Sequence, residues 1–401
     1  MREVGIVGVG HTKFGRWNGS FLDLVCAAGL EALLDAGVAP KEGCGIDQVF
    51  LASMGFGQLN RISGAASAVA DTLNLRPAMA ETVENGPASG ASAVKLGYMA
   101  IASGLCDTAL VIGAELMRGV SGWEATDFVS TMLHPAAEYP YGLTLPAFAG
   151  MFTRLYMEKY GVTEKDLAIV SVKNHENAMF NPVAHIQLVP DLYAITDDED
   201  ANVVNPYVAE PLRVYSTCPV SDGSAAVLLT AMDTGRKFAK APVRIAGIGQ
   251  ATDTHCVAER EVPTDLFAVR RSAEMAYRMS GFTPEDIDVA ELHDAFQILE
   301  IAESEEVGFF KRGEGHLAAR EGKTKVGGIK PINTSGGLKA KGHPVGATGV
   351  SQIVELVRQL RGEADGRQVE GAKTGLAVNF GGFGNNVIST ILTTVGSEGR
   401  D

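Results

Sequence analysis

The feature that most constrains this chain is an internal repeat. The opening stretch EVGIVGVGHTKF returns as APVRIAGIGQATDT from Ala241, and each copy is followed by a helical pattern with a Gly stop. The small-residue helix pattern SGASAVKLGYMAIASGLC has a counterpart in HPVGATGVSQIVELVRQLRG. Self-similarity on this scale indicates a repeated structural unit. A tandem duplication with a break near residues 231–240 therefore explains the chain better than two unrelated domains.

Short Val- and Ile-rich runs alternate with helical patterns in both halves. Strands are predicted in VGIVGVG, IDQVFLASM and DTALVIGAELM, and again in GLAVNFGGFGNNVISTILTTV near the end. Such alternation predicts an α/β fold with a largely internal sheet. Because 401 residues exceed one small core, two halves are expected, 1–235 and 236–401.

A segment around 118–210 has no counterpart in the second half. It mixes helical patterns with loops rich in Pro, His and Tyr. Insertions of this size commonly cover a site or form a subunit contact. We therefore expect this segment to cover a functional site.

Charge and composition exclude some classes of protein. The net charge of −14 argues against a general nucleic-acid binder, although it leaves room for an anionic ligand on a local patch. No apolar run approaches the ~20 residues of a membrane span, and the N-terminus enters a strand with no signal-peptide pattern. The expected location is cytoplasmic.

The five cysteines lie far apart and form no C-x-x-C pair. They are predicted to be reduced, buried small residues, with no disulfide and no metal site. Cys218, which precedes an Asp-Gly turn, is likewise interpreted as structural.

The stretch VENGPASGASAV, residues 83–94, reads as a tight Gly-rich turn that feeds a helix. Turns of this kind commonly hold a catalytic nucleophile. Here the prominent position is Pro87, so the stretch is either an elbow without its nucleophile or a plain turn.

Two further motifs contain histidine. In ELHDAFQILE, His293 and Asp294 follow an apolar strand pattern, where α/β folds place ligand-binding groups; a capping Asp beside a core His is the alternative. In NTSGGLKAKGHPVGATG, small residues surround His343 at the start of a helix, so backbone N–H groups and the helix dipole lie near it. Lys339 and Lys341 offer charge for an anionic substrate. A plain Gly-rich turn is the alternative there.

A third motif, AVNFGGFGNN, carries three glycines. Gly381, Gly382 and Gly384 could present N–H donors to an oxyanion. A β-turn between the last two strands would need the same residues.

Together these motifs resemble the thiolase superfamily over essentially the whole chain. HDAF stands where most thiolases have Asn-Glu-Ala-Phe and is similar to the form in sterol-carrier-protein-type and archaeal members. GHPVGATG resembles the family's His loop, CPVSDGSAAVLL its strand closing the first half, and FGGFGNN its C-terminal loop. The resemblance implies a five-layer αβαβα thiolase fold of two duplicated halves, a homodimer or a dimer of dimers, and a CoA-thioester substrate with no permanently bound cofactor.

The resemblance also implies roles for individual residues. His343 is the expected acid/base and oxyanion histidine, His293 lies opposite it, and the backbone near Gly382 adds a donor. Asp294, Ser335 and Asn379 are the expected substrate contacts.

The departures from the family pattern decide the function. Pro87 occupies the position of the nucleophilic Cys, and Asn379, preceded by Val378, occupies the position where a second Cys often stands. Proline has neither a nucleophile nor an N–H, so the acyl-enzyme route is closed at this position.

The remaining groups suit enolate chemistry, which needs no covalent intermediate. The leading prediction is a CoA-dependent carbon–carbon lyase that works by aldol or retro-aldol chemistry. Some thiolase-like proteins of steroid side-chain degradation are such aldolases and work with a small OB-fold/zinc-ribbon partner. They use Tyr where His293 and His343 stand, so Tyr141 in the covering segment is the predicted substitute for that proton-transferring Tyr and is expected to contact the substrate. The alternatives are an acyltransferase whose nucleophile comes from elsewhere, and a non-catalytic acyl-CoA-binding subunit.

Overall fold

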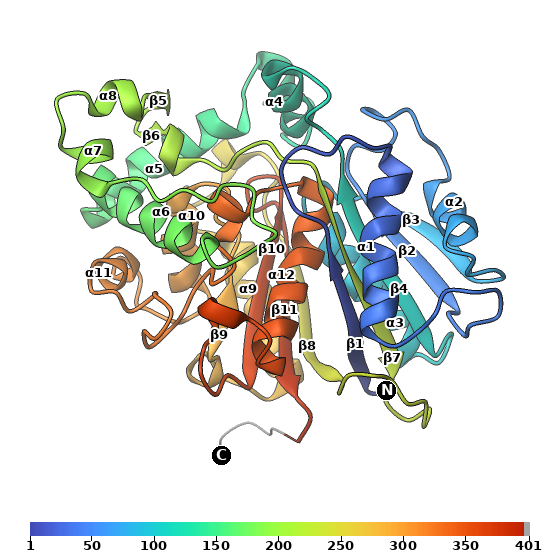
Figure 1. Ribbon diagram of the computed structural model, residues 1–401. Helices are drawn as coiled ribbons and strands as arrows, with labels where there is room; N and C mark the ends of the chain where they lie inside the picture. Colours follow the sequence, from blue (N-terminus) through green and yellow to red (C-terminus); the bar gives the residue numbers. More distant parts are fainter. Residues whose placement is uncertain (397–401) are drawn as a thin grey trace.

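The architecture is built on one long mixed sheet. The computed structural model describes residues 1–396, and in that part nine strands are joined in the order β3-β2-β4-β7-β1-β8-β11-β10-β9 (Figure 1). The strands are β1 Val4–His11, β2 Gln48–Ala52, β3 Met79–Val83, β4 Thr108–Glu115, β7 Gly223–Ala231, β8 Val243–Thr252, β9 Val289–Glu291, β10 Thr374–Gly381 and β11 Asn386–Thr394.

The predicted repeat appears in the strand order. The first half reads β3-β2-β4-β7-β1, and the second reads β9-β10-β11-β8, with Ile332 adding a parallel bridge to Ala290 on the outer side of β9. The innermost strands, β1 and β8, pair antiparallel through Gly5 and Ile6. Both halves therefore share one topology and meet at their equivalent strands.

Helices complete five layers, the arrangement that the resemblance implied. Helix α1 (Phe21–Asp35) packs on β1 and β7, and α9 (Phe267–Ser280) packs on β8 and β11. Helices α3 (Ser89–Ala102) and α12 (Val345–Arg361) contact each other and strands of both halves. Three buried apolar clusters correspond to the two outer layers and the central one.

A shared Gly-x-Gly pattern explains why the outer helices lie so close to the sheet. A Cβ on Gly8 or Gly10 would come within 2.1 Å of a carbonyl oxygen of α1. In the second half, Gly247 and Gly249 contact α9 in the same way, at 2.2 and 1.9 Å. Only glycine permits this approach of helix backbone to strand, which is why GVG and GIG recur.

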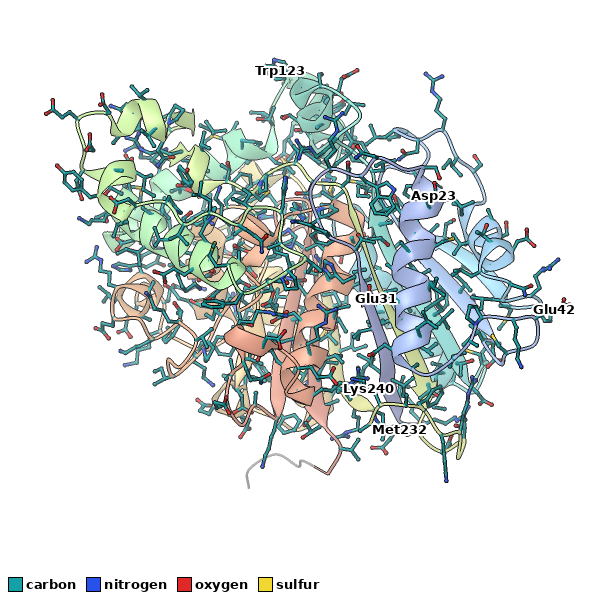
Figure 2. All side chains as sticks on the ribbon, in the orientation of Figure 1. Asp23, Glu31, Glu42, Trp123, Met232 and Lys240 are labelled. Atoms are coloured by element: carbon teal, nitrogen blue, oxygen red, sulfur yellow. The ribbon has the colours of Figure 1, made fainter. Side chains whose placement is uncertain are left out.

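The segment around 118–210 forms a cap of two longer helices, α5 and α6, and several short ones, and the polypeptide then continues to β7 (Figure 1). Trp123 projects from α4 with 79% of its surface exposed (Figure 2). The elements of this region are α4 Gly122–Ser130, η1 Tyr139–Tyr141, α5 Leu145–Tyr160, α6 Glu164–Ala178, α7 Leu192–Thr196, α8 Ala201–Val204, β5 Tyr207–Ala209, β6 Leu212–Arg213 and η2 Val214–Ser216.

The remaining elements pack beside these layers or link them. They are α2 Ala65–Thr72 in the first half, and in the second η3 Val257–Glu259, η4 Pro284–Asp286, α10 Gln297–Glu306, α11 Gly315–Arg320, the π-helical turn η5 Gly337–Lys341 and η6 Asp365–Arg367. Among residues 1–396, no helix has the length and apolar character that crossing a membrane requires.

Candidate active site

A cavity of about 220 Å³ brings together the turn before α3 and the loop before α12. Pro87 and His343 both line it, although they are far apart in the sequence and belong to opposite halves. Ala125 and Val129 of α4 and Leu145 of α5 form part of its wall, so the segment around 118–210 contributes directly to this cavity.

The turn that carries Pro87 is closed by its own hydrogen bonds. The Ser89 hydroxyl donates to the Gly86 carbonyl and accepts from the Asn85 N–H at 2.8 Å. Gly86 adopts φ +55°, and a Cβ there would overlap Met132. Ser89 is completely buried and fully engaged, which leaves Pro87 as the residue that the turn presents to the cavity.

His343 is held as a neutral imidazole with one free nitrogen. Its Nδ1 lies 2.7 Å from the Thr348 hydroxyl, which itself donates to the Pro344 carbonyl. A hydroxyl has one hydrogen, so this arrangement favours an Nδ1–H on His343 and a lone pair on Nε2. Burial lowers the pKa of His343 to about 3. His343 is therefore unprotonated at neutral pH with a lone pair on Nε2, although its lowered pKa also makes it a weaker base than a solvated histidine.

His293 has the complementary arrangement. Asn379 donates from Nδ2 to its Nδ1 at 3.3 Å, which leaves the hydrogen on Nε2. The ring stacks on Phe380, with centroids 5.2 Å apart, and its backbone N–H donates to Glu303 at 2.9 Å. Burial, reinforced by His343, holds the pKa of His293 well below its usual value. His293 is thus a neutral donor.

The two histidine rings meet edge to face, although only His343 is among the residues that line the cavity; His293 is buried beside it. Their centroids lie 5.0 Å apart at an interplanar angle of 86°. A proton acceptor and a hydrogen-bond donor so placed can take a proton from one atom and stabilise negative charge on another.

Two predicted substrate contacts turn out to be structural. Asp294 is completely buried and accepts from the N–H groups of Leu338 and Lys339 and from the Asn174 amide. The Ser335 hydroxyl, also buried, donates to Glu291. Neither residue lines the cavity, because both hold the loop that leads to His343.

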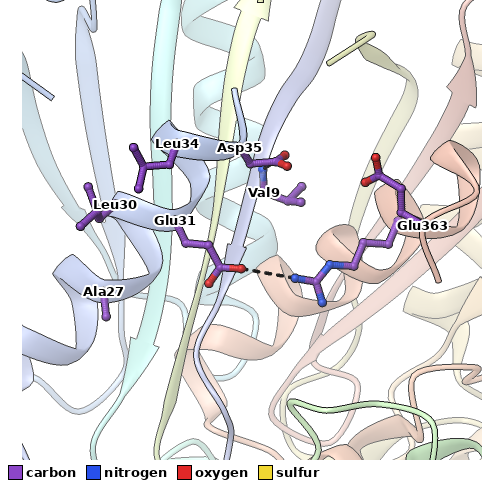
Figure 3. A pocket seen from close by; sticks show the side chains of 8 residues that line it. Val9, Ala27, Leu30, Glu31, Leu34, Asp35 and Glu363 are labelled. Carbon is purple, nitrogen blue, oxygen red and sulfur yellow. Dashed lines mark hydrogen bonds and ion pairs between the residues drawn. The ribbon is translucent and has the colours of Figure 1, made fainter. Parts of the chain in front are cut away.

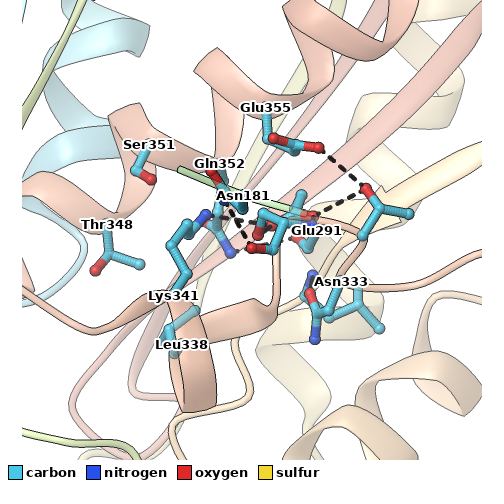
Figure 4. A network of polar contacts seen from close by, with 12 residues as sticks. Asn181, Glu291, Asn333, Leu338, Lys341, Thr348, Ser351, Gln352 and Glu355 are labelled. Carbon is cyan, nitrogen blue, oxygen red and sulfur yellow. Dashed lines mark hydrogen bonds and ion pairs between the residues drawn. The ribbon is translucent and has the colours of Figure 1, made fainter. Parts of the chain in front are cut away.

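The lysines that were expected to meet an anionic substrate are likewise engaged. Lys341 is 2% exposed and pairs with Glu291 at 3.4 Å (Figure 4). Lys339 donates to the carbonyls of Val214 and Thr217, and burial lowers its pKa to about 8. Both cations brace the loop before His343 and do not face the cavity.

The other predicted residues have three different placements. Tyr141 is 78% exposed and does not line the cavity, so its predicted contact with substrate is not supported. Gly382, with φ +63°, lies in the turn between β10 and β11, whose Phe383 N–H donates to Asn385. Asn379 is buried behind His293, so it acts through that histidine.

One wall residue is interpreted from the sequence as structural only. The motif pattern makes Cys218 structural, yet it lines the cavity together with His343. Burial raises the pKa of its thiol to about 12, so it is not a thiolate at neutral pH. Its position just before the strand β7, in the CPVSDG motif, is the available signal.

A larger cavity elsewhere carries less chemistry. It measures about 430 Å³ and lies between α1 and α12, lined by Glu31, Asp35 and Glu363 with Arg358 (Figure 3). Glu31 pairs with Arg358 and Glu363 with Lys240. Its charges are thus mutually satisfied, and the histidine pair lies elsewhere. Among the described residues there is also no group of three metal-ligating side chains.

The fold and the site define a duplicated α/β enzyme whose two halves each contribute to one histidine-containing cavity. The family profile described as "Thiolase, N-terminal domain" matches residues 4–233, and "Thiolase C-terminal domain-like" matches 249–394. The chain belongs to the thiolase superfamily.

Curated relatives cover nearly the whole chain. It is 41% identical to "Acetyl-CoA acetyltransferase" of Methanothermobacter thermautotrophicus, over 98% of this chain and 100% of that protein. It is 33% identical to human "Sterol carrier protein 2", over 98% of this chain and 72% of that protein.

Solved structures agree with this assignment. The structure of the "Ltp2-ChsH2(DUF35) aldolase" has a TM-score of 0.82 and 26% identity, with 98% of each chain covered. Human mitochondrial 3-ketoacyl-CoA thiolase has a TM-score of 0.71 at 19% identity, over 98% of this chain and 99% of that one, and supports the fold alone.

Proposed function

We propose that this thiolase-superfamily enzyme cleaves or forms a carbon–carbon bond next to a CoA thioester by retro-aldol or aldol chemistry, without a covalent acyl intermediate. The observation that carries the proposal is Pro87. It lines the same cavity as His343, on the turn where the family resemblance puts the nucleophile, and its side chain cannot attack a thioester.

The histidine pair supplies the steps that this reaction needs. In the cleavage direction, Nε2 of His343 takes the β-hydroxyl proton, the Cα–Cβ bond breaks, and its electron pair forms the enolate of the shorter acyl-CoA. His293 stabilises the enolate oxygen by a hydrogen bond from Nε2–H. The proton on His343 then passes to Cα, which gives a carbonyl compound and an acyl-CoA. The reaction needs no resident cofactor.

Turnover of a β-hydroxyacyl-CoA tests the proposal. We expect the purified chain to release a carbonyl compound and a shorter acyl-CoA in equal amounts, measured by liquid chromatography with mass detection. Straight-chain, branched and aromatic substrates should be compared, because the acyl group is not specified by the histidines. Absence of cleavage across all of them, with and without a partner, would refute the lyase.

The partner belongs in that experiment. The 26% identical aldolase, Ltp2-ChsH2(DUF35), is a complex of two components by its name, which supports a small OB-fold/zinc-ribbon protein as a partner here too. A homodimer is part of the same proposal. A non-catalytic acyl-CoA-binding subunit would behave differently, because His343→Ala would leave the activity of its complex unchanged.

An acyltransferase is the second candidate, and two observations favour it. The 41% identical relative is named acetyl-CoA acetyltransferase, and Cys218 lies in the cavity wall with His343. Its thiol could replace the missing nucleophile, although the raised pKa opposes this. Intact-mass measurement after incubation with acetyl-CoA distinguishes the acyltransferase from the lyase. An acyl adduct that Cys218→Ala abolishes would favour the acyltransferase.

A further inference from the structure

A buried carboxyl group lies directly behind His293. Glu303 of α10 is completely buried, and its Oε2 accepts the backbone N–H of His293 at 2.9 Å. The other carboxyl oxygen, Oε1, has no hydrogen-bond partner among the described residues. Glu303 therefore holds the main chain of His293 while accepting only one hydrogen bond.

Other buried carboxyl groups of this enzyme are better paired. Asp294 accepts three hydrogen bonds, and Glu115 accepts four. Burial nevertheless raises the pKa of both groups to about 7. The buried cation near this site, Lys173, pairs with Glu300. Because Glu303 has a single donor, it binds its proton more tightly than these neighbours do.

The charges around Glu303 act in the same direction. Burial, together with the nearby carboxyl groups of Asp294 and Glu300, raises the pKa of Glu303 well above its usual value. An ionised Glu303 would place a negative charge beside His293, favour protonation of that imidazole and destabilise an enolate anion held by its Nε2–H. A neutral carboxylic acid keeps the hydrogen bond to His293 and adds no charge.

We propose that Glu303 is a positioning residue that works as a neutral, protonated carboxylic acid, fixing the main chain of His293 without placing a charge behind the enolate. The kinetic part of this inference rests on the proposed function, and the protonation of Glu303 does not. Glu300, one turn earlier on α10, has a different task, because it pairs with Lys173.

Proton uptake on folding tests the protonation state without any substrate. Folded Glu303 keeps a proton that the unfolded chain releases above about pH 4.3, so rising pH favours the unfolded state. By urea titration, the unfolding equilibrium constant of the parent divided by that of Glu303→Gln should rise about tenfold per pH unit between about pH 5 and 7. Glu314→Gln, at an exposed position, is the matched control and should give a constant ratio. A constant ratio for Glu303→Gln would show that folded Glu303 is ionised, and would overturn the proposal.

Two variants test the positioning role. Glu303→Met removes the acceptor at a similar side-chain length, so kcat for β-hydroxyacyl-CoA cleavage should fall about 5- to 150-fold, with the Kd of a saturated acyl-CoA changed less than about threefold. Glu303→Gln keeps a neutral acceptor and should restore kcat to within about threefold of the parent. Parent-like kcat in Glu303→Met, or equal losses in both variants, would overturn the positioning role.

Amide hydrogen exchange gives the same answer without turnover. Peptides that contain His293 should exchange faster in Glu303→Met than in Glu303→Gln, because only the methionine leaves the His293 N–H without an acceptor. Equal exchange in the two variants would contradict the positioning role. Absence of cleavage by the parent, with the expected exchange and titration results, would refute the lyase and leave the role of Glu303 intact.

Discussion

At the scale of single residues, His343 carries the largest expected effect. Its Nε2 is the available proton acceptor in the cavity wall, and removing a general base typically costs about two to four orders of magnitude. We therefore expect His343→Ala to lower kcat for β-hydroxyacyl-CoA cleavage about 100- to 10,000-fold, with binding of saturated acyl-CoA changed little. His255→Ala, an exposed histidine, is the control. Retained activity in His343→Ala would remove this residue from the mechanism.

Asn379 is expected to act by fixing the tautomer of His293. Its amide donates to Nδ1 of that ring, and loss of a buried partner costs about 1–3 kcal/mol, or roughly 5- to 150-fold in kcat. Asn379→Leu should show this loss. Asn379→Asp should raise the pKa of His293 and make kcat change with pH around that pKa, where the kcat of the parent does not change. Asn202→Asp, at an exposed position, is the control and should leave the pH profile of kcat unchanged. Identical pH profiles for Asn379→Asp and the parent would exclude a positioning role.

The sequence predicts which residue types do the chemistry better than it predicts which atoms are free. His293 and His343 stand out from their motifs, and the structure brings their rings to 5.0 Å. The placement of Ser335 outside the cavity and of Cys218 in its wall was not predictable, because burial and hydrogen bonding depend on tertiary contacts. A Ser beside a Gly-rich loop looks available in the sequence, but in the structure its hydroxyl donates a hydrogen bond to Glu291.

At the scale of elements, the glycines of the two motifs allow α3 and α12 to touch. A Cβ on Gly90 would lie 2.9 Å from the Gly346 carbonyl oxygen and 2.9 Å from the Val350 nitrogen. The obstruction is backbone, which cannot rotate away. The small residues of GPASG and GATG, which the sequence made prominent for catalysis, therefore also serve helix packing.

Gly90→Ala tests this contact. Forcing apart two packed helices costs about 1–3 kcal/mol, and we expect that loss in free energy of unfolding by urea titration, together with a lower kcat because α12 follows His343 directly. Gly97→Ala in the same helix is the matched control, since its Cβ would meet the side-chain tips of Leu229 and Val111, which can adjust. Equal destabilisation by the two substitutions would show that the Gly90 contact is not special.

At the scale of the whole molecule, the duplication could be recognised in the sequence because each half packs an outer helix directly against an inner strand. GVG and GIG each allow a helix to lie directly on a strand, so the pattern survives in the sequence. The sequence predicts that the covering segment is an insertion, but it does not predict that this segment contributes to the cavity wall. That contribution depends on how α4 and α5 fold back over Pro87 and His343, which no local pattern encodes.

The duplicated core also buries ionisable groups whose effects on stability oppose one another. Burial lowers the pKa of His343 to about 3 and raises the pKa of Glu115 and Asp294 to about 7. As pH falls below about 6.5, His343 binds a proton in the unfolded state but not in the folded state. The free energy of unfolding therefore decreases. The two carboxyls have the opposite sign, because the folded state binds their protons first.

The difference in free energy of unfolding between a His343 variant and the parent separates the effect of His343 from that of the two carboxyls. In His343→Gln, the proton-linked loss disappears, so the free energy of unfolding of the variant minus that of the parent should rise as pH falls. The expected slope is about 1.4 kcal/mol per pH unit between pH 6.5 and the lower pKa near 3, or about 2 kcal/mol from pH 6.5 to 5. Urea titrations at pH 7, 6 and 5 give the two curves. A constant difference for His343→Gln would mean that His343 takes up its proton in the folded enzyme, and His343 would then act as an acid in the resting state.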